Sequence, residues 1–215
     1  MASKRAIIFI DGNNLYHCMK AMGINPGGID YLKLSEMICG KFNVVREKTI
    51  YYNSVPSIAS GEEKYYKHMR FLTGLENLPK FDVRRRKLQR RSNKEVLDEK
   101  MALLRQLKVC QKCRPAVEKN CLECIGGISE KEKGIDVMLA VEAIEKALKN
   151  EYDCCILVSG DADFIPMLNL IRANGKQIKS VSVPAGYSSD IRKTFTSDFM
   201  VLKKDELLEK CQKKQ

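Results

Sequence analysis

Four aspartates stand where a parallel sheet would bring carboxylates together. Asp11 directly follows one apolar segment, and Asp161 and Asp163 follow another. Ligand sites in open parallel sheets form beyond the carboxyl ends of strands, so we expect these three side chains at one edge. Asp136 opens an expected helix that would begin near the same edge, and we expect its side chain to point inward.

Such a group of carboxylates favours a divalent cation. Like charges at close range raise one another's pKa and burial adds to the cost, whereas a cation removes the conflict. Mg²⁺ prefers a few carboxylates with retained waters, which leaves room for a phosphate oxygen. The pattern therefore predicts a Mg²⁺ or Mn²⁺ site that activates water against a phosphodiester. Taken singly, each aspartate also fits an ordinary helix cap or turn.

Short apolar runs alternate with amphipathic segments, which predicts an α/β fold with a parallel sheet and right-handed crossovers. The expected strands are 5–10, 48–52, 81–86, 153–158, 177–183 and 199–202. The expected helices are 15–22, 31–40, 60–75, 135–149, 163–173, 188–195 and 203–215. In the helix 135–149, an apolar stripe at helical spacing is expected to face the core. Its members are Val137, Val141, Ile144 and Leu148.

A basic, cysteine-bearing stretch interrupts this pattern at residues 85–132. We therefore expect a discontinuous domain, 1–84 and 133–215, with 85–132 as a small insertion. Six positive charges fall within the eight residues from 84 to 91. Such side chains bind phosphates without reading sequence, and a solvated charged loop is the alternative. The candidate binding residues are Arg84, Arg85, Arg86, Lys87, Arg90 and Arg91.

Four of the nine cysteines form two C-x₂-C pairs within this insertion. Cys110 and Cys113 are followed, after seven residues, by Cys121 and Cys124. Four thiolates match a closed, structural Zn²⁺ site, so we predict a small Cys₄ zinc knuckle. Free or redox-active thiols and an iron–sulfur cluster are the alternatives.

The overall charge points to a polyanionic partner. The chain has 215 residues, with 38 Lys+Arg against 27 Asp+Glu, a net charge of +11 and a pI near 9.2. Nucleic acid is the commonest polyanion bound by such a chain. No apolar run approaches the roughly 18 residues of a membrane helix, and nine cysteines fit a reducing compartment. We expect a cytoplasmic protein without a membrane partner.

Three blocks resemble the signatures of NYN-domain proteins, including the LabA-like group, in the PIN-like nuclease superfamily. The blocks are Ile10-Asp-Gly-Asn-Asn-Leu15, Lys133-Gly-Ile-Asp136 and Ser159-Gly-Asp-Ala-Asp-Phe164. The resemblance covers about residues 4–84 and 133–202, and the long insertion departs from the family pattern. It implies a PIN-like three-layer α/β/α fold with a mainly parallel central sheet, and Mg²⁺- or Mn²⁺-dependent ribonuclease activity.

The resemblance also implies roles for individual residues. Matched by position, the acidic catalytic cluster is Asp11, Asp136, Asp161 and Asp163. Asn14 would orient a ligand or water, and Ser159 matches the small hydroxyl residue before the Gly-Asp pair, at the substrate. Asp190 lies in a region that matches only loosely.

The leading hypothesis is an endoribonuclease that acts on single-stranded RNA and leaves a 5′-phosphate and a 3′-hydroxyl. The basic insertion would hold the strand, and zinc would shape the insertion. The alternatives are a non-catalytic RNA-binding or regulatory adaptor of the same fold, and a zinc-knuckle module that binds protein. A homodimer also stays open. His17 and His68 are isolated in the sequence, and packing is their expected role.

Two other carboxylate folds fit less well. A phosphatase of the haloacid dehalogenase type needs a second aspartate at position 13, where Asn stands. A Toprim domain needs a glutamate at position 11, where Asp stands.

Overall fold

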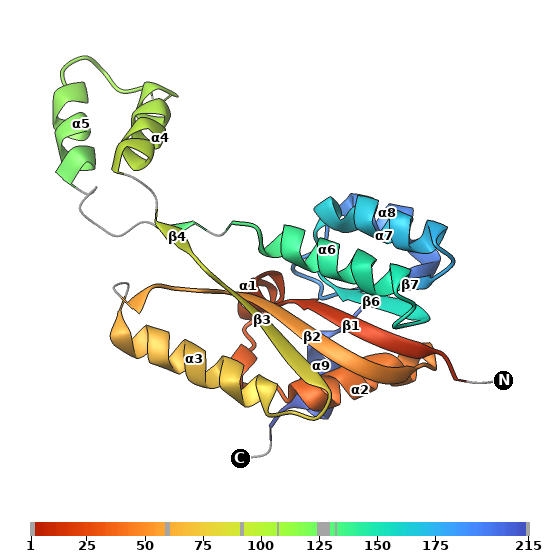
Figure 1. The fold of residues 1–215 in the computed structure, drawn as a ribbon. Coiled ribbons are helices and arrows are strands. Elements are labelled where there is room, and N and C mark those ends of the chain that lie inside the picture. The colour runs from red at the N-terminus through yellow and green to blue at the C-terminus, as the bar shows by residue number, and fades with distance from the viewer. Residues whose placement is uncertain are drawn as a thin grey trace.

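A six-stranded parallel sheet forms the centre of the protein (Figure 1). The computed structural model describes residues 3–58, 61–90, 93–106, 108–123, 130–131 and 133–213. The strand order is β3-β2-β1-β6-β7-β8, and each neighbouring pair runs parallel. The strands are β1 (Arg5–Asp11), β2 (Val45–Val55), β3 (Phe81–Lys87), β6 (Cys154–Val158), β7 (Gln177–Ser182) and β8 (Phe199–Val201). The six strands expected from the sequence are confirmed, and β2 extends further than predicted.

Helices cover both faces of the sheet, which confirms a three-layer α/β/α architecture (Figure 1). One face carries α6 (Ile135–Leu148), α7 (Ile165–Ala173) and α8 (Ser189–Thr194). The other carries α1 (Gly12–Ala21), α2 (Tyr31–Phe42), α3 (Glu62–Glu76) and α9 (Lys204–Cys211). Short 3₁₀ helices are η1 (Pro26–Gly28), η4 (Ala162–Phe164) and η5 (Thr196–Asp198). Among the described residues, no helix is both long and apolar enough to cross a membrane.

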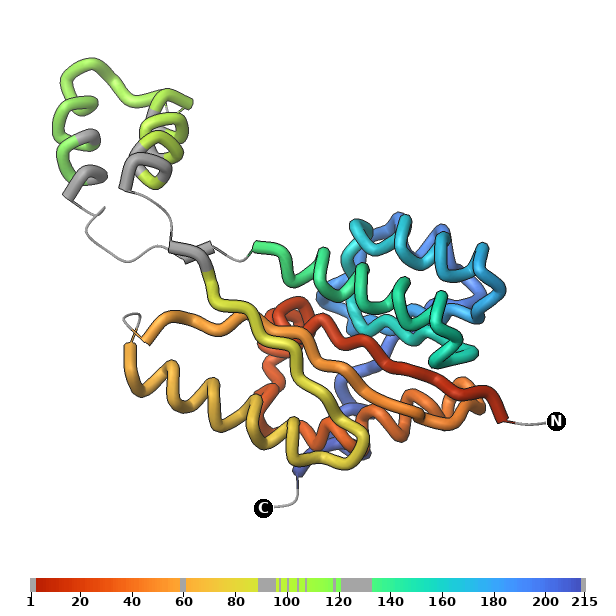
Figure 2. The backbone as a smooth tube through the Cα atoms, in the orientation of Figure 1, coloured from red at the N-terminus to blue at the C-terminus, as the bar shows by residue number. Residues whose placement is uncertain are grey.

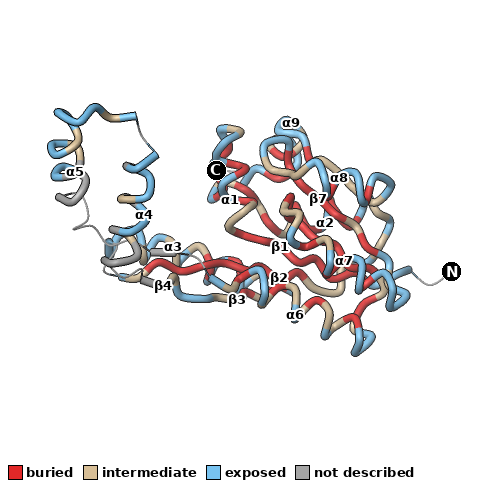
Figure 3. The backbone as a smooth tube through the Cα atoms, turned by 90° about the horizontal axis from the view of Figure 1, so that it is seen from above, coloured by how far each residue is buried: buried red, intermediate tan, exposed pale blue. Residues whose placement is uncertain are grey.

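The two central strands are apolar because both of their faces are covered. Residues 6–10 of β1 and 154–158 of β6 are each at most 2% exposed. A parallel strand buried on both faces reads as a continuous apolar run, as these two do. Figure 3 shows the strands as the buried centre of the molecule. Cys154 and Cys155 act here as small hydrophobic residues, and burial raises the pKa of the Cys154 thiol to about 11.

A helical pair occupies the predicted insertion. Strands β4 (Gln89–Arg90) and β5 (Glu130–Lys131) form a short antiparallel ribbon. Beyond it, α4 (Asn93–Gln106) and α5 (Arg114–Glu123) lie side by side (Figure 2). The chain enters this region from β3 and leaves it into α6.

Helix α6 packs on a different face from the one predicted. Val137 and Leu148 are each 65% exposed, and Val141 is 59% exposed. The buried residues are Ile135, Leu139, Ala143 and Ala147. The two buried alanines are small, so this side of the helix can approach the sheet closely. The prediction that the stripe faces the core was therefore wrong for Val137, Val141 and Leu148, whereas Ile144 is partly buried and packs against the core.

A charged cluster ties α6 to the edge of the sheet. Arg84 of β3 donates to both carboxylate oxygens of Glu142, from Nε over 2.9 Å and from Nη2 over 2.8 Å. The Tyr52 hydroxyl donates to Glu142 Oε2 over 2.8 Å. Burial acts to raise the pKa of Glu142, but hydrogen bonds from Arg84 and Tyr52 and the charge of Arg84 hold it below its ordinary value. The carboxylate is therefore ionised and joins β2, β3 and α6.

Substitution of Glu142 by Gln is expected to lower the free energy of unfolding by about 2 kcal/mol at pH 7, since Arg84 loses its charged partner. Because the folded pKa is depressed, this stabilisation is present above pH 4.5 and is lost as the pH falls through the folded pKa. Urea unfolding at pH 7 and pH 4 measures both effects. Glu145→Gln, at an exposed surface pair with Lys149, should change little. A Glu142→Gln effect that is unchanged at pH 4 would contradict the assignment.

Candidate active site

The candidate site lies where the order of the strands reverses. The chain builds outward from β1 to β2 and β3, then returns to place β6 on the other side of β1. Ile10 and Val158 are register partners, so the carboxyl ends of β1 and β6 lie side by side. A crevice at such a switch point is where ligands bind in open α/β sheets. Asp11 comes directly after Ile10, and Ser159 comes directly after Val158.

Asp11 is a buried carboxylate, and each of its oxygens accepts a hydrogen bond. It is 4% exposed and caps helix α1, with Oδ1 accepting the backbone N–H of Asn14 over 3.1 Å. Oδ2 accepts the hydroxyl of Ser159 over 3.1 Å. An ionised carboxylate has about four acceptor positions, which is why aspartate can serve both a helix cap and a cation.

The loop after β6 is held against the start of α1 by polar contacts. Asn14 Oδ1 accepts the backbone N–H of Gly160 over 3.3 Å. Ser159 Oγ accepts the backbone N–H of Asp161 over 3.2 Å, while its own O–H donates a hydrogen bond to Asp11 Oδ2. Ser159 thus connects the first predicted aspartate with the second. Asp161 in turn caps η4 by accepting the N–H of Asp163 over 3.0 Å.

Three glycines allow the loops of the site to approach so closely. A Cβ on Gly160 would stand 1.6 Å from the carbonyl oxygen of Gly186, and one on Gly186 would stand 1.9 Å from Cys18 Sγ. A Cβ on Gly12 would stand 2.4 Å from the ring of Tyr51. The loop after β7 therefore forms a further wall of the site.

The sequence reasoning missed this wall. Its one signal was a glycine-containing turn, 184–187, after a strand that ends at the same edge of the sheet. Cys18 was missed as well: its Sγ lies 3.7 Å from Asn14 Oδ1, and burial and the nearby Asp11 raise the pKa of its thiol.

The outer aspartates are more exposed than the inner ones. Asp163 is exposed, and Asp136 in the first turn of α6 is exposed as well, so the expectation that it points inward was wrong. Asp190, in the first turn of α8, is also exposed. Within the described part of the chain, no group of three or more His, Cys, Asp or Glu side chains could hold a metal ion.

The inner residues still fit a sparsely liganded cation. Mg²⁺ is usually held by one or two carboxylates, with waters and substrate phosphates as its remaining ligands. Asp11 and Asp161, connected through Ser159, match that minimal set. A cage of four carboxylates does not match the described side chains.

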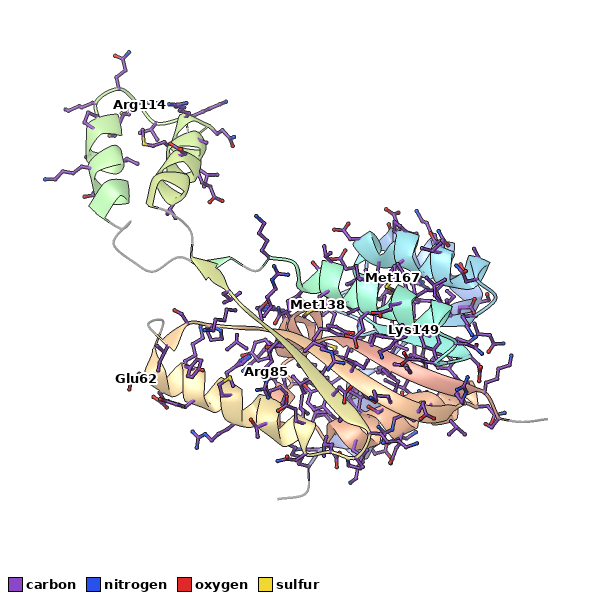
Figure 4. All side chains as sticks on the ribbon, viewed as in Figure 1. Glu62, Arg85, Arg114, Met138, Lys149 and Met167 are labelled. Carbon is purple, nitrogen blue, oxygen red and sulfur yellow. The ribbon has the colours of Figure 1, made fainter. Side chains whose placement is uncertain are left out.

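The predicted basic residues have different surroundings. Arg84 is bound to Glu142, and Arg85 pairs with Glu76 of α3. Figure 4 shows Arg85 between β3 and α3. Arg86 Nη1 lies 3.5 Å from the carbonyl oxygen of Gly134, and Lys87 is exposed. The side chain of Arg90 and the whole of Arg91 lie outside the described residues.

Half of the predicted zinc site is described. Cys110 and Cys113 are exposed and lie in a tight turn, with Cys113 N–H donating to the Cys110 carbonyl over 3.1 Å. Hydrogen bonds from the Cys113 side chain and backbone lower the pKa of Cys110, as suits a metal-binding thiol. The side chain of Cys121 and the whole of Cys124 lie outside the described residues.

Comparison with known proteins identifies the family. The model of the NYN domain matches residues 5–203, so this chain belongs to the NYN domain family of the PIN-like nuclease superfamily. Members of this family are generally nucleases. The fold is similar to the crystal structure of a protein of unknown function from Vibrio parahaemolyticus, with a TM-score of 0.55 and 18% identity. That match covers 94% of this chain and 95% of the other. No curated protein matches this chain.

Alanine at Gly160 is expected to lower the free energy of unfolding by about 2 kcal/mol or more, since its Cβ overlaps the backbone of Gly186. Alanine at Gly40 is the matched control. This glycine lies inside α2 with open space where a Cβ would be added, so Gly40→Ala should stabilise by about 0.5–1 kcal/mol. Thermal unfolding measures both. Equal effects of the two substitutions would contradict the close approach of the loops.

Proposed function

We propose that this chain is a metal-dependent endoribonuclease whose active site is built on Asp11, Ser159 and Asp161. The observation that supports this most directly is the hydrogen-bonded connection of these residues at the switch point of a nuclease-family fold. A divalent cation bound there would activate water and neutralise charge on the phosphodiester.

Each residue of this group has a separate task. Asp11 and Asp161 would hold Mg²⁺ or Mn²⁺, and the hydrogen bond from the Ser159 hydroxyl would keep the Asp11 carboxylate in place for that role. Asn14 fixes the spacing of the two loops through Gly160. Asp136 and Asp163, exposed near the same edge, would contribute to the acidic cluster through water. Hydrolysis by this route leaves a 5′-phosphate and a 3′-hydroxyl.

The substrate in this proposal is single-stranded RNA. Lys87 and Arg86, at the end of β3, would bind its phosphates, together with Arg90 and Arg91 of the insertion. The net charge of +11 supports a polyanionic substrate. Arg84 is engaged with Glu142 through two hydrogen bonds and is therefore not assigned to the substrate.

Asp161→Asn should abolish cleavage of a labelled single-stranded RNA in the presence of Mn²⁺. Ser159→Ala should reduce the rate by about ten- to a hundredfold, the usual cost of losing a group that supports a metal ligand. The control is Asp205→Asn on α9, an exposed aspartate that should leave the rate unchanged. Chelation by EDTA should stop the wild-type reaction. Equal cleavage by the wild type and Asp161→Asn would exclude the assigned site.

A non-catalytic RNA-binding protein is the second candidate. The net charge of +11 supports it equally well, since it favours RNA binding whether or not the strand is cleaved. Salt-sensitive RNA binding without metal-dependent cleavage would identify this function.

The insertion is proposed to hold a structural Zn²⁺ on Cys110, Cys113, Cys121 and Cys124. Cys121 falls in the last turns of α5, eight residues beyond Cys113, which is about 12 Å along a helix axis. The structure has α5 continuing to Glu123, so four thiolates at a single ion would require the end of this helix, from Cys121 onward, to unwind when zinc binds. The resulting knuckle would present the basic residues of the insertion in a fixed shape.

Zinc measured by mass spectrometry should reach about one equivalent per chain in the wild type and be lost in Cys113→Ser. The matched control is Cys39→Ala, a buried cysteine of α2 whose removal should leave the zinc content unchanged. Wild-type protein without zinc, purified without chelators, would contradict the proposed site.

A further inference from the structure

A row of polar side chains leads away from the candidate site along the edge of the sheet. Asn13 follows β1, Asn53 lies near the end of β2, and His68 lies on α3. Asn53 Nδ2 donates to Asn13 Oδ1 over 2.7 Å, and His68 Nε2 lies 2.6 Å from Asn53 Oδ1. Asn53 is 3% exposed, and an amide is costly to bury without hydrogen bonds.

Arg85 extends this row to the outer strand. Asn53 and Arg85 are register partners in the β2–β3 ladder, so their side chains share one face of the sheet. Burial, together with the charges of Lys64 and Arg85, lowers the pKa of His68. The imidazole is therefore neutral near pH 7. The positive charge beside the row comes from Lys64 and from Arg85, whose Nη2 also pairs with Glu76.

Two donors in the row have no hydrogen-bond partner. Asn13 Nδ2 and Arg85 Nε are the two buried side-chain nitrogens without a partner in the described part of the chain. Such groups are rare in native proteins and call for an explanation. Asn13 is only partly buried, and the Arg85 side chain is 28% exposed. A rotation of either side chain can therefore bring its N–H to a ligand.

We propose that Asn13, Asn53, His68 and Arg85 form a binding site for a phosphate of the RNA strand, beside the scissile phosphate. Unpaired N–H donors next to positive charge select an anion with several acceptor oxygens, as a phosphodiester has. The RNA strand then runs from Asp11 across the carboxyl ends of β2 and β3 toward Arg86 and Lys87. This inference rests on the proposed function, because RNA is its substrate.

The test is the affinity of the full-length protein for a fluorescein-labelled, unstructured 20-nucleotide RNA. All variants carry Asp161→Asn, so that the strand is not cleaved. Asn53→Asp places a carboxylate in the row and should weaken binding roughly tenfold. Its control is Asn169→Asp on the exposed surface of α7, which makes the same change in charge elsewhere.

A second pair of variants covers the case in which Asn53→Asp is unstable in thermal unfolding. Arg85→Gln removes a donor and a charge from a partly exposed side chain and should weaken binding at least about fivefold. Arg46→Gln is its control, since Arg46 lies near the amino end of β2, at the opposite end of the sheet.

The outcomes separate the row from general charge effects. Weaker binding in Asn53→Asp and Arg85→Gln, with both controls at the parent affinity, supports the site. Unchanged affinity in these two variants, or equal weakening in the controls, overturns it. This test does not depend on turnover. If the wild type cleaves RNA with metal but substitutions in the row leave RNA affinity unchanged, the proposed function stands and only the phosphate site is overturned. If RNA binds through the row but is never cleaved, only the proposed nuclease activity is overturned.

Discussion

The burial of the Asp11 carboxylate is the constraint on which the rest of the site depends. A carboxylate that is 4% exposed must be given hydrogen bonds, and the backbone of α1 and the hydroxyl of Ser159 provide them. Ser159 lies 148 residues further along the chain than Asp11, and the two meet only because β1 and β6 are neighbours. The same requirement explains the glycines, since a side chain at position 160 would push the loops apart.

Much of the fold could be predicted because its signals are local. The continuous apolar runs of β1 and β6 identify central parallel strands without reference to the rest of the chain. Helix α6 shows where this reasoning ends. Its sequence contains two apolar faces, one built from Val137, Val141 and Leu148 and the other from Leu139 and alanines. Spacing alone does not say which face meets the sheet, since that depends on how closely the helix can approach it.

The candidate site was predictable in part for a similar reason. Asp11 ends β1, and Ser159 and Asp161 come one and three residues after β6, so the pairing of these two strands brings them together. Asp136 stands on a helix, and the position of its side chain depends on the rotation of α6, which the sequence did not reveal. Asn53 and His68 each look ordinary in the sequence, because their relation arises only when α3 packs over β2 and β3.

The contacts between β3 and the region of α6 have a consequence for which insertions related chains can carry. Arg84 and Arg86 lie on β3, Gly134 comes directly before α6 and Glu142 lies on α6, so these contacts join the two elements between which the chain makes its long excursion. The ends of a long excursion are thus already held at a fixed distance by the sheet and helix. Doubling the length of a flexible excursion costs only about 0.6 kcal/mol once its ends are joined. The excursion between β3 and α6 is therefore a position at which related chains can gain, lose or exchange whole modules while the scaffold of the site is preserved.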